Sequence, residues 1–142
     1  MEKKKGGFVI RNGHSKNKQK GQYSSPDSTQ MSEVLLFYEN VEYIRTSVKR
    51  GKNYVDYIVR SQEENRRCFY SQRIHIYILY EMLPEYFIRV NRSEIINAFC
   101  ITGRSGTYLF IGNKEFKIGA TYKKEVNEKL NLYFHPSRKD GQ

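Results

Sequence analysis

From residue 31 onward, short apolar runs alternate with Gly, Asn and charged residues along the chain. Val, Ile, Tyr and Phe dominate these runs, which is typical of strands joined by tight turns. Strands are predicted at residues 34–38, 43–48, 54–60, 87–91, 95–101, 108–111 and 115–118. Gly112 and Asn113 separate the last two runs and predict a hairpin turn, because both residue types tolerate positive φ. The pattern therefore predicts a mainly β fold.

Helical spacing is clearest near the C-terminus. Tyr122, Val126 and Leu130 recur every fourth position within residues 121–132, which places them on one face of a helix. Thr121 is the predicted N-cap, because its hydroxyl oxygen can accept a hydrogen bond from a backbone N–H of the first turn. We therefore expect a short helix after the last strand.

Residues 71–83 carry two conflicting patterns. Ile74, Ile78 and Met82 are four positions apart, as in a helix, whereas the β-branched and aromatic residues that dominate the segment favour a strand. The pattern leaves both structures open, and Pro84 ends either one. One or two short helices are thus expected beside the strands.

The chain is strongly basic, with 25 Lys and Arg against 15 Asp and Glu and a formal net charge of +10. Residues 1–30 contain seven basic and two acidic side chains, so +5 belongs to this segment and +5 to the rest of the chain. A charge excess of this size favours a polyanionic partner. Nucleic acid is the partner class that the composition indicates first.

Residues 1–30 contain too few apolar side chains to offset the entropy of ordering the chain. We predict a disordered basic arm there, a folded domain at 31–134 and a flexible tail at 135–142. The arm either contacts nucleic-acid phosphates without adding sequence preference or is simply solvated.

Several other classes find little support in the sequence. No apolar run is long enough to span a membrane or act as a secretory signal, so the expected location is the cytoplasm. Cys68 and Cys100 are expected to be reduced, packed thiols. His14, His75 and His135 lie in no metal or nucleophile motif, so we expect no catalytic site, metal or cofactor.

The segment YFIRVNRSEIIN, from Tyr86 to Asn97, has a distinctive order of residues. It resembles the central signature of the LytTR family of DNA-binding domains, found in LytR/AgrA-type bacterial transcription regulators. The matching positions are Phe87, Arg89, Val90, Asn91, Arg92, Ser93, Ile95, Ile96 and Asn97. The similarity extends over about residues 33–130, and residues 71–83 stand where the family has a short helix that ends in Leu-Pro.

The resemblance implies an elongated, multi-sheet β domain with one or two short helices, whose loops enter successive major grooves of double-stranded DNA. Asn91, Arg92 and Asn53 are the candidates for contacts to bases. Asn suits adenine, and Arg suits the O6 and N7 atoms of guanine. For the central triplet the alternative is an ordinary solvated turn.

Contacts to DNA phosphates are expected from a larger set of basic and hydroxyl side chains. The candidates are Ser93, Arg89, Lys49, Arg50, Lys52, Thr121 and Lys123. Gly119 and Ala120 replace a Ser-Arg pair that is common in the family, which weakens the match in that segment. A charged loop at 61–68 is expected to extend the hairpin between two strands, with no assigned role.

We expect a stand-alone regulator, because residues 1–30 leave no room for the receiver domain that many relatives carry. The resemblance also implies binding to repeated DNA sites by two copies of the chain, with a homodimer on DNA as one such arrangement. Two other classes remain open: a module that binds RNA or single strands by stacking bases on exposed rings, and a protein-interaction module. Burial of the rings of Tyr43, Tyr54, Tyr57 and Tyr77 would disfavour base stacking.

Overall fold

The computed structural model describes residues 6–11, 33–60 and 67–135, in which ten antiparallel strands form three sheets. The first sheet pairs β1 (Gly7–Arg11) with β2 (Glu33–Phe37). The central sheet has the order β5 (Arg67–Arg73), β4 (Gly51–Arg60), β3 (Val41–Ser47), β7 (Glu94–Asn97) and β6 (Phe87–Asn91). The third sheet has the order β10 (Lys114–Lys117), β9 (Tyr108–Ile111) and β8 (Gly103–Ser105).

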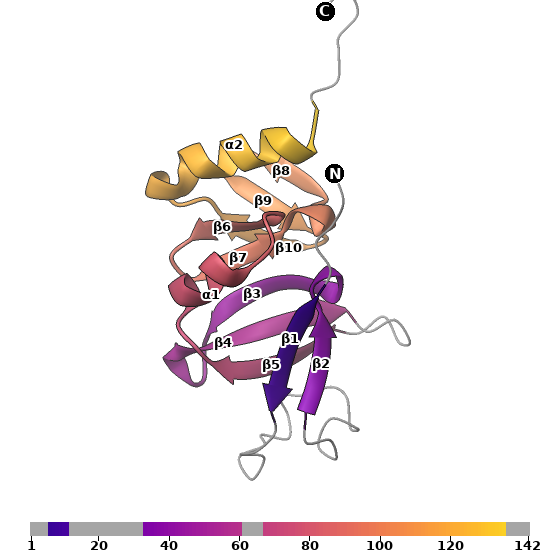
Figure 1. Cartoon of the computed structure of the whole chain (residues 1–142). Coiled ribbons are helices and arrows are strands. Elements are labelled where there is room, and N and C mark those ends of the chain that lie inside the picture. Colours follow the sequence, from indigo (N-terminus) through magenta and orange to yellow (C-terminus); the bar gives the residue numbers. More distant parts are fainter. Residues whose placement is uncertain (1–5, 12–32, 61–66, 136–142) are drawn as a thin grey trace, which may run out of the picture.

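Two α-helices and three single 3₁₀ turns complete the described part of the chain. They are α1 (Ile76–Met82), α2 (Lys123–Tyr133), η4 (Tyr38–Asn40), η5 (Ala98–Cys100) and η6 (Ala120–Tyr122). Figure 1 shows the sheets following one another along the molecule, with the β1–β2 sheet at one end and α2 across the three-stranded sheet at the other. This arrangement confirms the predicted mainly β, multi-sheet fold with one or two short helices, of which the described residues contain two.

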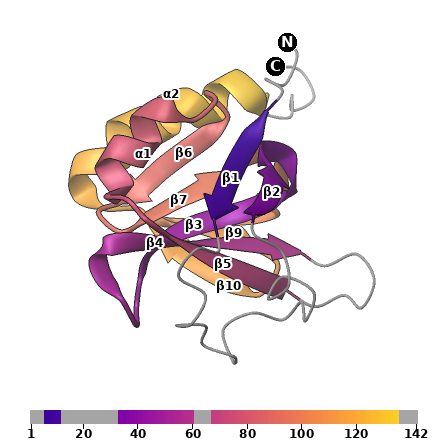
Figure 2. The same cartoon turned by 60° about the horizontal axis from the view of Figure 1, so that its bottom comes forward.

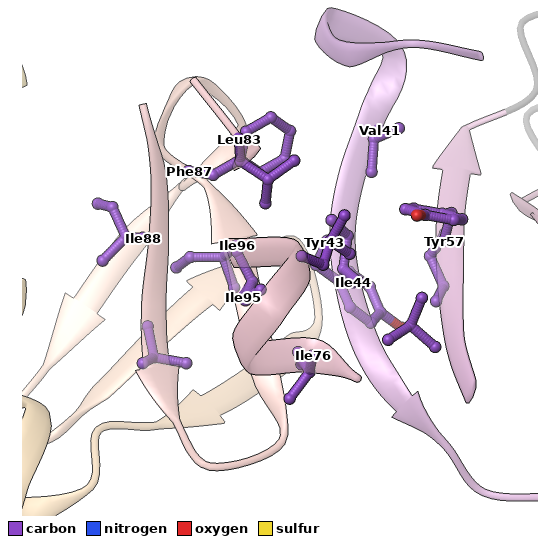
Figure 3. Packing of buried hydrophobic residues seen from close by; sticks show 14 of the residues in the cluster. Val41, Tyr43, Ile44, Tyr57, Ile76, Leu83, Phe87, Ile88, Ile95 and Ile96 are labelled. Atoms are coloured by element: carbon purple, nitrogen blue, oxygen red, sulfur yellow. The ribbon is translucent and has the colours of Figure 1, made fainter. Parts of the chain in front are cut away.

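The core lies around the central sheet, which is covered on both faces. Residues 41–44 of β3 and 55–58 of β4 are buried without interruption, and so are residues 95–97 of β7. Strands covered on both faces lack a strict alternation of apolar and polar positions. The two buried acids within these runs are paired, Glu42 with Arg60 at 2.9 Å and Asp56 with Arg45 at 3.2 Å. Figure 3 shows Ile44, Phe87 and Ile96 packed together with their neighbours in this core.

Each of the seven predicted strands coincides with a strand of the structure, but three strands were missed and one was predicted too long. The missed strands are β1, β5 and β8. The strand predicted over 95–101 ends at Asn97, whose side-chain amide donates to the carbonyl oxygen of Val41 at 2.9 Å and accepts from the backbone N–H of Phe99 at 2.9 Å. These bonds turn the chain into η5. The Gly112–Asn113 turn joins β9 to β10 as predicted, with a φ of 61° at Gly112.

The predicted C-terminal helix is α2, but its predicted N-cap is wrong. Thr121 lies inside η6, and Tyr122 occupies the cap position without a side-chain cap hydrogen bond. The undecided segment 71–83 contains both structures, because β5 runs to Arg73 and α1 begins at Ile76. Leu83 and Pro84 follow the end of α1.

The predicted disordered arm is wrong for residues 7–11, which form β1. Phe8 and Ile10 point into the core while Val9 on the opposite face is exposed, so this strand belongs to the folded unit. The ring centroid of Phe8 lies 4.9 Å from that of Tyr38 and 4.3 Å from that of Tyr57. Residues 1–5 and 12–30 of the predicted arm, 31–32 of the predicted domain and 136–142 of the predicted tail lie outside the described residues, as does the 61–66 part of the charged loop.

Candidate nucleic-acid interface

Three segments that the sequence singled out lie along one edge of the molecule. They are the β3–β4 hairpin at 48–53, the β6–β7 turn at 92–93 and the segment 119–123, and we call them together the basic edge. β3 and β6 end at this edge, and their partners β4 and β7 begin there, because the pairing is antiparallel. The left side of Figure 1 shows the hairpin, the end of β6 and the start of α2 in a row, and Figure 2 shows them on the same side.

Backbone hydrogen bonds join the three segments into one unit. The N–H of Thr46 donates to the carbonyl oxygen of Ser93 at 2.9 Å, which joins the end of β3 to the β6–β7 turn. The N–H of Gly119 donates to the carbonyl oxygen of Val90 at 2.8 Å, which joins the end of β6, next to that turn, to the residue before η6. The spacing between the segments is therefore set by the sheets and not by the loops themselves.

The β3–β4 hairpin has an ordered tip. The Ser47 hydroxyl oxygen accepts from the N–H of Arg50 at 3.0 Å, and Gly51 takes a φ of 89° that only glycine adopts without strain. The Arg50 guanidinium lies 5.4 Å from the centre of the Tyr54 ring. Lys49, Lys52 and Asn53, three of the predicted DNA contacts, are exposed around this tip.

Asn91 uses its side-chain amide within the protein. Its nitrogen donates to the Glu94 carboxylate at 2.9 Å and to the carbonyl oxygen of Lys117 at 2.8 Å. Its oxygen accepts from the N–H of Ser93 at 2.9 Å and from the Ser93 hydroxyl at 3.3 Å. An amide with this many internal partners orders the turn and ties it to β10.

Arg89 stabilises the same turn through hydrogen bonds to its backbone. Its Nε donates to the carbonyl oxygen of Asn91 at 3.3 Å and its Nη2 to that of Arg92 at 2.9 Å. Its guanidinium also lies 5.3 Å from the centre of the Tyr122 ring, which connects the turn to η6. Asn91 and Arg89 together fix the backbone that presents the next side chain, Arg92.

Arg92 is exposed at the tip of the β6–β7 turn. Within residues 6–11, 33–60 and 67–135, no hydrogen bond, ion pair or ring contact engages its guanidinium. The guanidinium therefore presents its five N–H donors to solvent from an ordered backbone. Two of these donors lie parallel in one plane, as a contact to two neighbouring acceptor atoms requires.

The third segment presents Thr121 and Lys123, both exposed, on η6 and the first turn of α2. A Cβ added at Gly119 would lie 3.2 Å from the Tyr122 ring and 3.5 Å from the Cβ of Asn91. The close packing of Asn91 and Tyr122 leaves little room for a larger residue at position 119. This crowding gives a physical reason for glycine where the family commonly has a side chain.

Two further cations belong to this edge and were missed by the sequence analysis. Arg73 is exposed at the end of β5 and pairs in register with Tyr54, and Lys117 is exposed at the end of β10, 5.4 Å from the Tyr108 ring. Their placement depends on strand pairing, and β5 itself carries no clear strand pattern.

Two acids near the basic edge form ion pairs, since Asp56 is buried against Arg45 at 3.2 Å and Glu94 lies 3.9 Å from Lys114. The basic edge is therefore electropositive.

The rings named for base stacking are mostly covered. Tyr43 and Tyr57 are buried, and Tyr54 is half-buried beneath Arg50, whereas Tyr77 on α1 is 53% exposed. Burial also raises the pKa of Tyr57, whose hydroxyl donates to Gln72. The arrangement disfavours a surface that stacks successive single-stranded bases.

The histidines and acids of the described segments form no cluster of three or more groups that would suit a metal ion. His75 lies 5.3 Å from the Tyr77 ring, and His135 follows α2 at the surface. No helix among the described residues is both long and apolar enough to cross a membrane.

The fold and the edge together define a mainly β domain of three antiparallel sheets with electropositive loops at one side. No family model matches the chain, and no curated protein matches it either. A solved structure, the LytTr DNA-binding domain of a Bacillus cereus protein described as a methyl-accepting/DNA response regulator, matches with a TM-score of 0.54 and 18% identity. The match covers 79% of this chain and 94% of that one. The fold is thus of the LytTR type, as the Tyr86–Asn97 resemblance predicted.

Proposed function

We propose that the chain binds double-stranded DNA through the basic edge and distinguishes sequences in the major groove. The observation that carries this proposal is Arg92, whose guanidinium has no partner among the described residues and lies on a turn that Asn91 and Arg89 hold in place. A major groove about 12 Å wide admits such a loop, and Arg can donate two hydrogen bonds to guanine O6 and N7. The neighbouring structure with the same fold is a DNA-binding domain by its own description.

The remaining candidates divide by chemistry. Asn53 on the hairpin is the second proposed base contact, and Lys49, Arg50, Lys52, Ser93, Thr121 and Lys123 are the proposed phosphate contacts. The internal hydrogen bonds of Asn91 favour a positioning role over a direct contact to adenine. Arg89 also donates within the protein, which favours positioning of the turn over a contact to a DNA phosphate. Arg73 and Lys117 join the phosphate set because of where their strands end.

The biological role proposed with this activity is that of a bacterial transcription regulator, non-enzymatic and cytoplasmic, which acts on repeated sites with two copies bound. The support for this role is the LytTR-type fold, which the chain shares with a DNA-binding domain. The measurement that separates duplex reading from general polyanion binding is the affinity for duplex DNA, single-stranded DNA and RNA of one sequence. Preference for the duplex is expected, and equal affinity for all three would contradict the proposal.

Removing a proposed phosphate contact should weaken every duplex alike. Lys49→Ala and Lys52→Ala should each reduce the slope of log affinity against log salt concentration by about 0.9, because one fewer counterion is released. The ratio of affinities for two different sequences should stay unchanged. Fluorescence anisotropy titrations at several salt concentrations provide the slopes.

The control for this prediction is Arg11→Ala, which removes one exposed positive charge from β1, outside the basic edge. Its salt slope should equal that of the unmodified protein. A slope reduced equally by Arg11→Ala would mean that net charge matters and the position of the charge does not.

A further inference from the structure

Val48 is an apolar residue in an unexpected place. At 79% it is the most exposed of the large hydrophobic side chains in the described part of the chain, and it lies at the tip of the β3–β4 hairpin beside Lys49. The side chain thus contributes almost no buried area to the fold of this molecule. The side chain is exposed beside charged and polar residues of the same hairpin, Lys49, Lys52 and Asn53.

The backbone around Val48 is ordered. The Ser47–Arg50 hydrogen bond and the positive φ of Gly51 close the turn on either side of Val48 and Lys49. Thr46, two residues before Val48, donates to the carbonyl oxygen of Ser93, the residue that follows Arg92. Val48 and Arg92 are therefore presented by one connected unit, so a duplex that meets one side chain is held in a fixed relation to the other.

One base presents an apolar group in the major groove: thymine, through its C5 methyl. Contacts between small apolar side chains and this methyl are an established way to recognise thymine. We infer that Val48 contacts a thymine methyl and makes the protein prefer thymine at one position of its site. This inference rests on the proposed function, since it needs the hairpin to lie in a major groove.

The test uses a duplex obtained by selection from a random DNA pool and replaces its thymines one at a time by deoxyuridine, which removes only the methyl group. At the contacted thymine, the replacement should weaken binding by about fourfold, the value expected for losing one buried methyl. Val48→Ala should weaken binding to the unmodified duplex to a similar or greater degree. With Val48→Ala, deoxyuridine at that position should have no further effect.

Val9→Ala is the matched control, because it makes the same chemical change at an exposed residue of β1 outside the basic edge. It should respond to every deoxyuridine as the unmodified protein does. If Val48→Ala and the unmodified protein responded alike at all thymines, Val48 would not contact a methyl, although sequence-specific binding would stand. If selection gave no preferred duplex at all, the proposed function would fail, and this inference with it.

Discussion

Replacing Arg92 with Ala is expected to remove most of the discrimination at one guanine position of the preferred DNA site. The guanidinium is exposed and unengaged within the described residues, while Arg89 and Asn91 hold the turn beneath it. A paired hydrogen bond from Arg to guanine discriminates against other bases by about 1–3 kcal/mol. The free energy of binding to the preferred duplex should weaken by that amount. Binding to a duplex in which the guanine is replaced should change far less.

Arg92→Lys separates a base contact from a phosphate contact at this position. Lysine keeps the positive charge but lacks the planar pair of donors. The salt slope of Arg92→Lys should therefore match that of the unmodified protein, while discrimination at the guanine position is weakened, because an ammonium group can still donate to guanine O6 or N7 but without the paired geometry. Full discrimination retained by Arg92→Ala would show that Arg92 does not contact a base.

Replacing Phe8 with Ala should destabilise the fold by about 3 kcal/mol, the usual cost of truncating a buried aromatic ring. Phe8 lies in the segment that composition assigns to a disordered arm, yet its ring packs against Tyr38 and Tyr57 in the core. The measurement is a urea unfolding curve followed by circular dichroism. The transition midpoint should fall with an unchanged slope.

Val9→Ala serves as the neighbouring control for this stability measurement. Val9 is in the same strand but 45% exposed, so its truncation should change the unfolding free energy by about 0.5 kcal/mol or less. Equal, negligible effects of both substitutions would contradict the place of β1 in the folded unit and restore the disordered arm.

The part of the fold predicted from the sequence is the part whose signal is local. β3, β4, β6 and β9 contain dense runs of Val, Ile, Tyr and Phe, and the spacing of Val126 and Leu130 defines α2 without reference to any other element. Such a run indicates its own secondary structure, because its apolar side chains must be buried whatever element they pack against.

The missed strands depend on partners distant in the sequence. β1 has only Phe8, Val9 and Ile10 as apolar residues, and its partner β2 begins at Glu33. β8 has the sequence GRS, which contains no strand-forming residue, and exists because β9 pairs with it. Pairing of this kind is decided by the register of the neighbouring strand, which the pattern of a single segment does not contain.

The candidate site also has one part that depends on local sequence and another that depends on contacts between distant segments. Residue types and a family resemblance singled out Arg92 and the Lys49 hairpin, and both lie exposed in turns of the structure, while their contacts to DNA stay predictions. The bonds of Asn91 could not be predicted, because one of its partners is the backbone of Lys117, 26 residues later. Arg92 therefore remains the leading proposed base contact, and the internal hydrogen bonds of Asn91 favour a part in positioning it.

Selection of bound duplexes from a random DNA pool at moderate salt tests the central proposal most directly, followed by the affinity for the best sequence against a shuffled one. The proposal predicts enrichment of a motif that contains guanine and thymine, repeated within the site, and a clear preference over the shuffled duplex. The contradicting result is no enrichment, with equal and equally salt-sensitive binding to duplex DNA and RNA. Such a result would reduce the basic edge to a general polyanion-binding surface.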